Sequence, residues 1–207
     1  MKQLVFATEN PGKLREVRVF AGNYGVEVLS PSNAGLKQHQ VEETGTTYEE
    51  NAKLKVKSCL GQEAAKQLVI CGDDSGMEID ALGGEPGIHT RRWLGYEMSD
   101  DEIIEHTLKS LSGEKNRKVT SKTVLAYSNH GSPIQFVTGE LSGRIAEESF
   151  DVPNQEGFPF RQLFIVNANP EIPMWKFDEL PLSERNGQLS HREKAFLKLF
   201  KELGWAK

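Results

Sequence analysis

The sequence Cys71-Gly72-Asp73-Asp74-Ser75-Gly76 follows an apolar run over residues 68–71. The run predicts a buried strand, and Ser75-Gly76 predicts that the strand ends in a loop. In open α/β sheets, ligands bind at loops beyond the carboxyl ends of strands. Two adjacent, partly buried carboxylates are unfavourable unless a cation or a proton neutralises them. The stretch therefore indicates a cation site, while the alternative is a simple turn, because Asp, Ser and Gly all favour turns.

The composition narrows the classes of partner. The 207 residues include 30 acidic and 25 basic side chains, for a net charge of -5. This balance argues against a nucleic acid polymer, which needs a broad basic surface, but leaves room for a single nucleotide. Cys59 and Cys71 lack CxxC spacing and predict reduced core residues of a cytoplasmic protein. The apolar run at residues 4–7 is too short to cross a membrane, so no membrane partner is expected.

A second polar stretch, Thr8-Glu9-Asn10-Pro11-Gly12-Lys13, follows the strand predicted at residues 4–7. A helix is expected after it, with Leu14, Val17 and Ala21 on one face. Free N–H groups and the helix dipole at such a start attract anions, and Lys13 adds a cation. The stretch is neither a Walker A loop nor a GxGxxG fingerprint. An ordinary strand-to-helix turn with a solvated lysine remains the alternative.

A second helix is predicted to start near Thr47, and it carries Asn51 and Lys55 four residues apart, so both side chains can point the same way. Glu42 lies in the loop before this helix. A carboxylate there can compensate the helix dipole or bind a metal, and the sequence leaves both roles open.

The second half of the chain changes pattern. Residues 118–146 alternate with a period of two around Asn129-His130-Gly131-Ser132, which predicts an antiparallel hairpin, with residues 139–146 as a possible third strand. Residues 163–166 predict one more buried strand, and residues 147–162 and 167–187 are interpreted as loops. Strands and helices of both kinds together indicate an α/β fold with a mixed sheet flanked by helices.

A further helix is predicted to begin with a capping box of Ser99 and Glu102. The last predicted helix opens at Ser190, and His191 and Arg192 lie in its first turn. Positive charge at a helix start opposes the helix dipole. This placement suggests that the two side chains face an anion or a polar ligand.

Six short motifs in this order resemble those of the inosine triphosphate pyrophosphatase (RdgB-like) family over nearly the whole chain. The motifs are Thr8-x-Asn10-x-x-Lys13, Glu42-Glu43-Thr44-Gly45, Glu50-Asn51-Ala52-x-x-Lys55, Asp73-Asp74-Ser75-Gly76, Asp80-Ala81-Leu82-Gly83-Gly84-x-Pro86-Gly87-Ile88 and Ser190-His191-Arg192. The resemblance implies one domain over residues 1–207 with an elongated mixed sheet, two lobes, a nucleotide cleft between them, and a homodimer. It also implies Mg²⁺-dependent hydrolysis of ITP, dITP or XTP to the monophosphate and pyrophosphate.

The resemblance assigns roles to the phosphate-side residues. Thr8, Asn10, Lys13 and Lys55 would hold the triphosphate, and Ser75 would contact the substrate. Glu42 and Asp74 would bind Mg²⁺, which takes one or two carboxylates together with phosphate oxygens and waters. Asp74 would also be the general base for the attacking water, and Asp73 would assist the metal site from just outside its ligands.

The base-side positions depart from the family pattern. His191 and Arg192 match the base-side pair, in which Arg192 would donate to a purine 6-oxo oxygen that adenine lacks. Where the family has Phe-Gly-Tyr-Asp, this chain has Phe158-Pro159-Phe160-Arg161. Phe158 can still stack on a base, but Arg161 reverses a charge. Asn186 stands at the place of a family lysine, and a one-residue insertion would bring Arg185, one residue earlier, to that place.

These departures leave two alternatives to the activity that the resemblance implies. One is the same fold with a changed base specificity, and the other is a non-catalytic nucleotide-binding sensor. A serine hydrolase using Ser75 is excluded by the lack of a GxSxG elbow. A zinc enzyme is disfavoured because the five histidines are scattered without ligand spacing.

Overall fold

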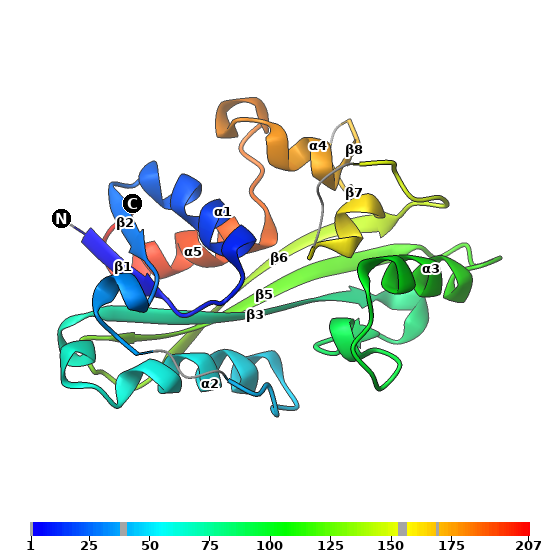
Figure 1. Ribbon diagram of the computed structural model, residues 1–207. Helices are drawn as coiled ribbons and strands as arrows, with labels where there is room; N and C mark the ends of the chain where they lie inside the picture. The colour runs from blue at the N-terminus through cyan, green and yellow to red at the C-terminus, as the bar shows by residue number, and fades with distance from the viewer. Residues whose placement is uncertain (1, 38–40, 153–156, 169) are drawn as a thin grey trace. The chain divides into compact units, whose positions relative to one another are not determined.

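The computed structural model describes residues 2–37, 41–152, 157–168 and 170–207 (Figure 1). The helices of this part are α1 (Pro11–Gly22), α2 (Tyr48–Leu60), α3 (Asp100–Ser110), α4 (Met174–Glu179) and α5 (His191–Glu202). The strands are β1 (Lys2–Phe6), β2 (Val26–Leu29), β3 (Val69–Ile79), β4 (Pro86–Gly87), β5 (Lys118–Asn129), β6 (Gln135–Ile145), β7 (Phe164–Val166) and β8 (Ile172–Pro173). The predicted α/β class is confirmed.

In the described part of the chain the strands form one mixed sheet of eight strands, in the order β2-β1-β3-β5-β6-β7-β8, with β4 paired to β3. β1 pairs in parallel with both β2 and β3. β7 pairs antiparallel with β6 and β8. The parallel half carries helical crossovers and the antiparallel half is built from hairpins, as the two sequence patterns predict.

Two compact units divide the chain. Unit 1 comprises Met1–Ser75, Thr123–Gly139 and Arg192–Lys207, and unit 2 comprises Gly76–Lys122 and Glu140–His191. β3, β5 and β6 therefore contribute residues to both units. Each unit has its own apolar core.

Unit 1 has helices on both faces of its strands: α2 lies on one face, and α1 and α5 lie on the other (Figure 1). The alternation of β1 explains this arrangement. Val5 belongs to the core formed with Ala52 and Val56 of α2, while the ring of Phe6 meets that of Phe196 on α5 edge-on at 5.3 Å. Successive side chains of a strand point to opposite faces, so a continuous apolar strand needs a cover on each side.

Unit 2 packs α3 and α4 with the remaining strands around a core that includes Ile103, Phe164 and Phe177. The capping box predicted for α3 is confirmed, because Ser99 accepts from the backbone of Glu102 and the Glu102 side chain accepts from the backbone of Ser99.

Three sequence interpretations need correction. β3 does not end before Asp73 but continues to Ile79, so the two carboxylates lie inside a strand. Residues 139–145 are not a separate strand but continue β6. Residues 167–187, interpreted as a loop, contain β8 and α4. Residues 153–156 and 169, within the two segments interpreted as loops, lie outside the described residues.

The surroundings of β3 explain the first of these corrections, in which the strand continues through the two carboxylates. Gly72 allows α2 to approach closely, because a Cβ at this position would lie 2.8 Å from the Cβ of Lys55. That approach brings a cation to the acidic pair, and neutralised acids can remain in a buried strand despite their turn propensity. Cys59 and Cys71 are buried and form no disulfide, as predicted. No helix in the described ranges has the length and apolar character needed to cross a membrane.

Candidate active site

The start of α1 is capped by its own sequence. Asn10 is the N-cap, and its side-chain oxygen accepts from the N–H groups of Gly12 at 2.8 Å and Lys13 at 3.1 Å. The Thr8 hydroxyl accepts in turn from the Asn10 N–H at 3.2 Å. The sequence predicted free N–H groups here, but Asn10 occupies two of them and Pro11 has none. The side chain of Lys13, rather than an open helix start, supplies the positive charge.

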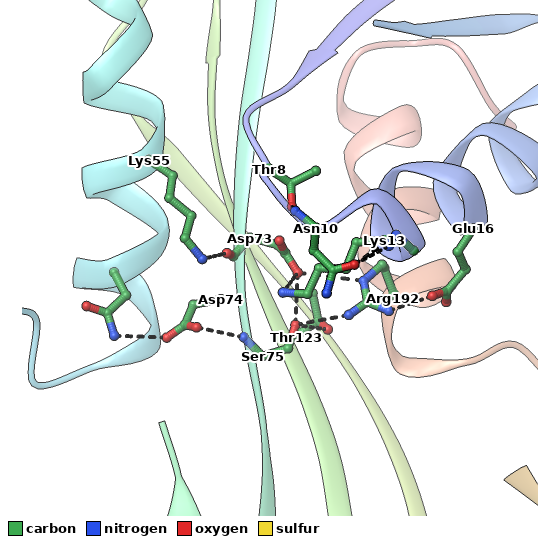
Figure 2. A network of polar contacts seen from close by, with 12 residues as sticks. Thr8, Asn10, Lys13, Glu16, Lys55, Asp73, Asp74, Ser75, Thr123 and Arg192 are labelled. Atoms are coloured by element: carbon green, nitrogen blue, oxygen red, sulfur yellow. Dashed lines mark hydrogen bonds and ion pairs between the residues drawn. The ribbon is translucent and has the colours of Figure 1, made fainter. Parts of the chain in front are cut away.

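Asp73 lies at the centre of a network of charged groups within unit 1 (Figure 2). Its side chain is fully buried, and Oδ2 accepts from Lys13 Nζ at 2.9 Å and from the Ser75 hydroxyl at 3.0 Å. Arg192 Nε lies 3.6 Å from the same oxygen. Burial alone would raise the pKa of Asp73, but Lys13, Arg192 and Lys55 outweigh it and hold that pKa well below its usual range. Asp73 is therefore a permanent anion.

Two lysines from different helices flank this carboxylate. Lys55 on α2 donates to the backbone oxygen of Asp73 at 2.7 Å and pairs with Glu43 at 2.6 Å. Burial lowers the pKa of Lys55, but Asp73, Glu43 and Asp74 raise it by more. For Lys13, burial dominates and lowers the pKa although Asp73 opposes it. The helix-borne lysines thus meet at β3, and their role as phosphate-binding cations stays a prediction.

Asp74 has different surroundings from Asp73. It is 5% exposed, its Oδ1 accepts from the Ser75 N–H at 3.0 Å, and its Oδ2 accepts from Asn51 Nδ2 at 3.1 Å. Its pKa is raised to about 6, because burial and the neighbouring Glu43 outweigh the opposite effects of Lys55, Asn51 and Lys13. A carboxyl group whose pKa is raised toward 7 can exchange a proton near physiological pH, which is what a general base requires.

Arg192 faces carboxylates, as its placement at the start of α5 suggested. Its NH1 pairs with Glu16 of α1 at 2.8 Å, and its NH2 lies 3.5 Å from the Ser75 hydroxyl (Figure 2). Ser75 also shares a hydrogen bond of 2.8 Å with the Thr123 hydroxyl on β5. Arg192, at the start of α5, therefore contacts residues of both α1 and β3. His191, its neighbour, is buried at the start of the same helix.

The acidic loop before α2 places its two glutamates differently. The Glu42 side chain is exposed, whereas Glu43 pairs with Lys55 and acts electrostatically on Asp74. In this structure the carboxylate next to the network is that of Glu43, and the assignment of Glu42 as a metal ligand stays a prediction.

The oxygen-rich donor set fits Mg²⁺. The described residues contain no group of three or more His, Cys, Asp or Glu side chains able to hold a metal by themselves. Mg²⁺ does not need one, because it commonly binds one or two carboxylates and completes its shell with substrate phosphates and waters. Asp74 and the acidic loop offer hard carboxylate oxygens, and Oδ1 of Asp73 is buried with no hydrogen-bond partner among the residues described.

The predicted base-side residues Phe158 and Arg185 lie in unit 2. The Arg161 guanidinium sits 4.1 Å from the centre of the Phe158 ring, and its Nε pairs with Asp178 at 2.8 Å. Arg185 stacks over Phe177 at 4.7 Å, donating to the backbone oxygens of Leu180 and Asp178. Both arginines thus have partners inside their own unit.

Sequence reasoning missed three side chains of the network: Glu16, Asn51 and Thr123. Asn51 had a signal, since its spacing from Lys55 placed both on one face of α2. Glu16 follows Lys13 by three residues and shares its helix face in the same way. Thr123 had none, because it reaches Ser75 only through the pairing of strands distant in sequence.

A mixed α/β sheet in which two lysines and an arginine surround paired aspartates has the cations to bind phosphate groups and the carboxylates to bind a metal. The comparison with known families agrees: residues 4–202 match the Ham1 family. A dITP/XTP pyrophosphatase of Bacillus subtilis is 37% identical over 206 residues, covering 98% of each chain. The chain therefore belongs to the Ham1 family.

Solved structures give the same result. The Staphylococcus aureus Ham1 protein has a TM-score of 0.73 at 32% identity, covering 98% of both chains. A HAM1 protein from Coxiella burnetii has a TM-score of 0.74 at 29% identity, covering 100% of both. The mixed fold is thus that of the family.

Proposed function

We propose that this chain is a nucleoside triphosphate pyrophosphatase that hydrolyses non-canonical purine nucleotides such as dITP and XTP to the monophosphate and pyrophosphate. The observation that carries the proposal is the buried network of Lys13, Lys55 and Asp73 beside Asp74. Relatives along nearly the whole chain are named dITP/XTP pyrophosphatase, which supports the same substrate class here.

Asp74 is the proposed general base. Its pKa of about 6 leaves it mainly ionised above neutral pH, and one of its oxygens takes a proton from the attacking water. The water oxygen then bonds to the α-phosphorus, the bond from that phosphorus to the bridging oxygen breaks, and pyrophosphate leaves.

The lysines stabilise the leaving group. Lys13 and Lys55 are point charges that follow phosphate oxygens as charge builds up on pyrophosphate. Both are paired with carboxylate or carbonyl oxygens in this structure, so the substrate exchanges one set of oxygen partners for another. Mg²⁺, held by Asp74 and an acidic residue of the loop at 42–43, would supply further neutralisation of phosphate charge when bound.

A second candidate function is the same hydrolysis of nucleoside triphosphates with a preference for a different base. It is favoured by Arg161, which places a cation against the Phe158 ring where the family pattern has an acid. A guanidinium offers donors where a carboxylate offers acceptors, so it would favour a base with a different edge. Phe158, Arg185, His191 and Arg192 are proposed to face the base in either case.

The quaternary state and location complete the proposal. We propose a homodimer, each chain acting as one catalytic domain over residues 1–207, in the cytoplasm, where the free thiols of Cys59 and Cys71 remain reduced. Light scattering on the purified chain measures the first of these directly.

The deciding experiment is a panel of dITP, XTP, ITP, GTP, ATP, CTP and UTP with Mg²⁺. Pyrophosphate and orthophosphate are measured separately. Pyrophosphate release from dITP and XTP far above that from GTP and ATP is expected. A preference for another nucleotide would instead support the second candidate, and tight nucleotide binding without release of either product would support a sensor.

A further inference from the structure

Asn51 is a buried side chain on α2 with two defined partners in unit 1. It is 1% exposed, its Oδ1 accepts from the Gly45 N–H at 2.8 Å, and its Nδ2 donates to Asp74 Oδ2 at 3.1 Å. One partner needs an acceptor and the other needs a donor. Only an amide side chain provides both at this length, and the two contacts also fix which end is oxygen.

The loop before α2 is built around this amide. A Cβ on Gly45 would lie 2.6 Å from Asn51 Oδ1 and 2.7 Å from the Cβ of Glu50, so the close approach requires glycine. Thr47 caps the helix, which places Asn51 one turn inside it. The acidic residues of the loop lie two and three positions before Gly45, so the amide also fixes where their backbone runs.

Asp74 needs an external partner to set its orientation. Rotation of a carboxylate about its last bond is soft, because this torsion has no sharp staggered minima. Oδ1 accepts from the adjacent Ser75 N–H, and the side-chain bond to Oδ2 comes from Asn51. Without this second bond, the carboxylate can turn away from the direction in which it accepts a proton.

We infer that Asn51 is a positioning residue for the proposed hydrolysis: its amide holds the Asp74 carboxylate and the acidic loop at a fixed separation. This inference rests on the proposed function, since it concerns the same site. The competing interpretation is a buried amide that only contributes to stability. The two differ in what they predict for kcat at unchanged folding.

Asn51→Asp keeps the shape and the acceptor toward Gly45 but sets a carboxylate against Asp74, so Asn51→Leu, which removes the donor without adding charge, is measured beside it. We expect kcat for dITP to fall by about 100-fold, the effect typical of a misplaced catalytic group, with KM within about threefold of the wild type. Gly45→Ala is expected to raise the Mg²⁺ concentration needed for half-maximal rate, because it displaces the acidic loop.

Ser128→Ala is the matched control in the same unit. Ser128 is fully buried and donates to the Ser132 backbone oxygen, away from the network. We expect it to lower the melting temperature and leave kcat unchanged. If Asn51→Asp does not fold, Asn51→Ser removes the same donor in a smaller side chain and is measured instead.

A folded Asn51 variant with kcat within threefold of the wild type would overturn the inference, and so would an equal loss of kcat in Ser128→Ala. Wild-type protein without pyrophosphate release would overturn the proposed function itself. The two failures are therefore separate observations.

Discussion

The phosphate-side network of unit 1 and the base-side group of unit 2 contrast in how their charges are arranged. In unit 1, the buried Asp73 contacts Lys13 of α1, Lys55 of α2 and Arg192 of α5. In unit 2, Arg161 pairs with Asp178, with side chains 22% and 19% exposed, and lies over the Phe158 ring. The network of unit 1 joins segments that are far apart in sequence, whereas the pair in unit 2 joins two segments that are close in sequence.

The difference shows which part tolerates change. A buried cluster whose members neutralise one another cannot lose one charge without leaving another uncompensated. The Arg161–Asp178 pair keeps some contact with water, which can hydrate a charge left without its partner, so its replacement should cost less than a substitution in the network. This agrees with the sequence, in which the phosphate-side motifs match the family pattern and the base-side loop departs from it.

The largest expected effect comes from removing the metal. Chelation with EDTA should reduce pyrophosphate release to background, and excess Mg²⁺ should restore it, because the carboxylates of Asp74 and the acidic loop repel the substrate phosphates unless a cation lies between them. The circular dichroism spectrum serves as the control for folding. Full activity in EDTA would show that the unit 1 network acts without a metal.

The next effect comes from Asp74→Asn, which removes the proton acceptor and keeps the shape. We expect kcat to fall by about 10³-fold with nucleotide binding retained, within the range for loss of a general base. Pyrophosphate release under single-turnover conditions measures the chemical step. Retained turnover would show that a residue other than Asp74 is the general base.

Lys13→Met is expected to have an intermediate effect on activity and the largest effect on stability. It leaves the buried Asp73 without its shortest ion pair, which should lower the free energy of unfolding by about 3 kcal/mol and kcat/KM by about 100-fold. Asp73→Asn in the same chain should recover part of the stability but not the activity. Denaturant unfolding of the two single variants and the double variant measures this coupling, and simple additivity would contradict a cooperative network.

The smallest effect is expected for Arg161→Asp in unit 2. It places a second acid beside Asp178 and removes the guanidinium from the Phe158 ring, and because both members of the pair are mostly buried, the loss of stability is expected to be about 2 kcal/mol. We expect the ratio of kcat/KM for dITP and dGTP to change by less than about tenfold.

The reversed pair, Arg161→Asp with Asp178→Arg, provides the control because it restores the ion pair. Stability is expected to return to near the wild-type value. A change of nucleotide preference larger than a hundredfold in the single variant would instead identify Arg161 as the main determinant of base choice, and the contrast between the two units would fail.

Much of this molecule could be predicted from local sequence. The strand at residues 4–7, the helix with Leu14 and Val17, the hairpin around residue 130 and the capping box at Ser99 are confirmed, because each depends on neighbours within a few residues. The lysines and aspartates were grouped into one site by the family motifs that they match, while the acidic pair alone indicated only a cation site.

Other features depended on the tertiary structure. The sequence predicted that β3 ends before Asp73, but the approach of α2 at Gly72 lets the strand continue through the carboxylates. Free N–H groups were predicted at the start of α1, where the Asn10 side chain caps them.

By itself, the sequence determined the α/β class and those helices and strands that have a clear periodicity, because these depend on neighbours close in sequence. Only the tertiary structure decided that Asn51 holds Asp74, that Glu16 and Thr123 join the network, and that Glu43 rather than Glu42 pairs with Lys55. The physical reason is that a hydrogen bond depends on distance and angle, and across residues distant in sequence these are fixed only when the elements pack.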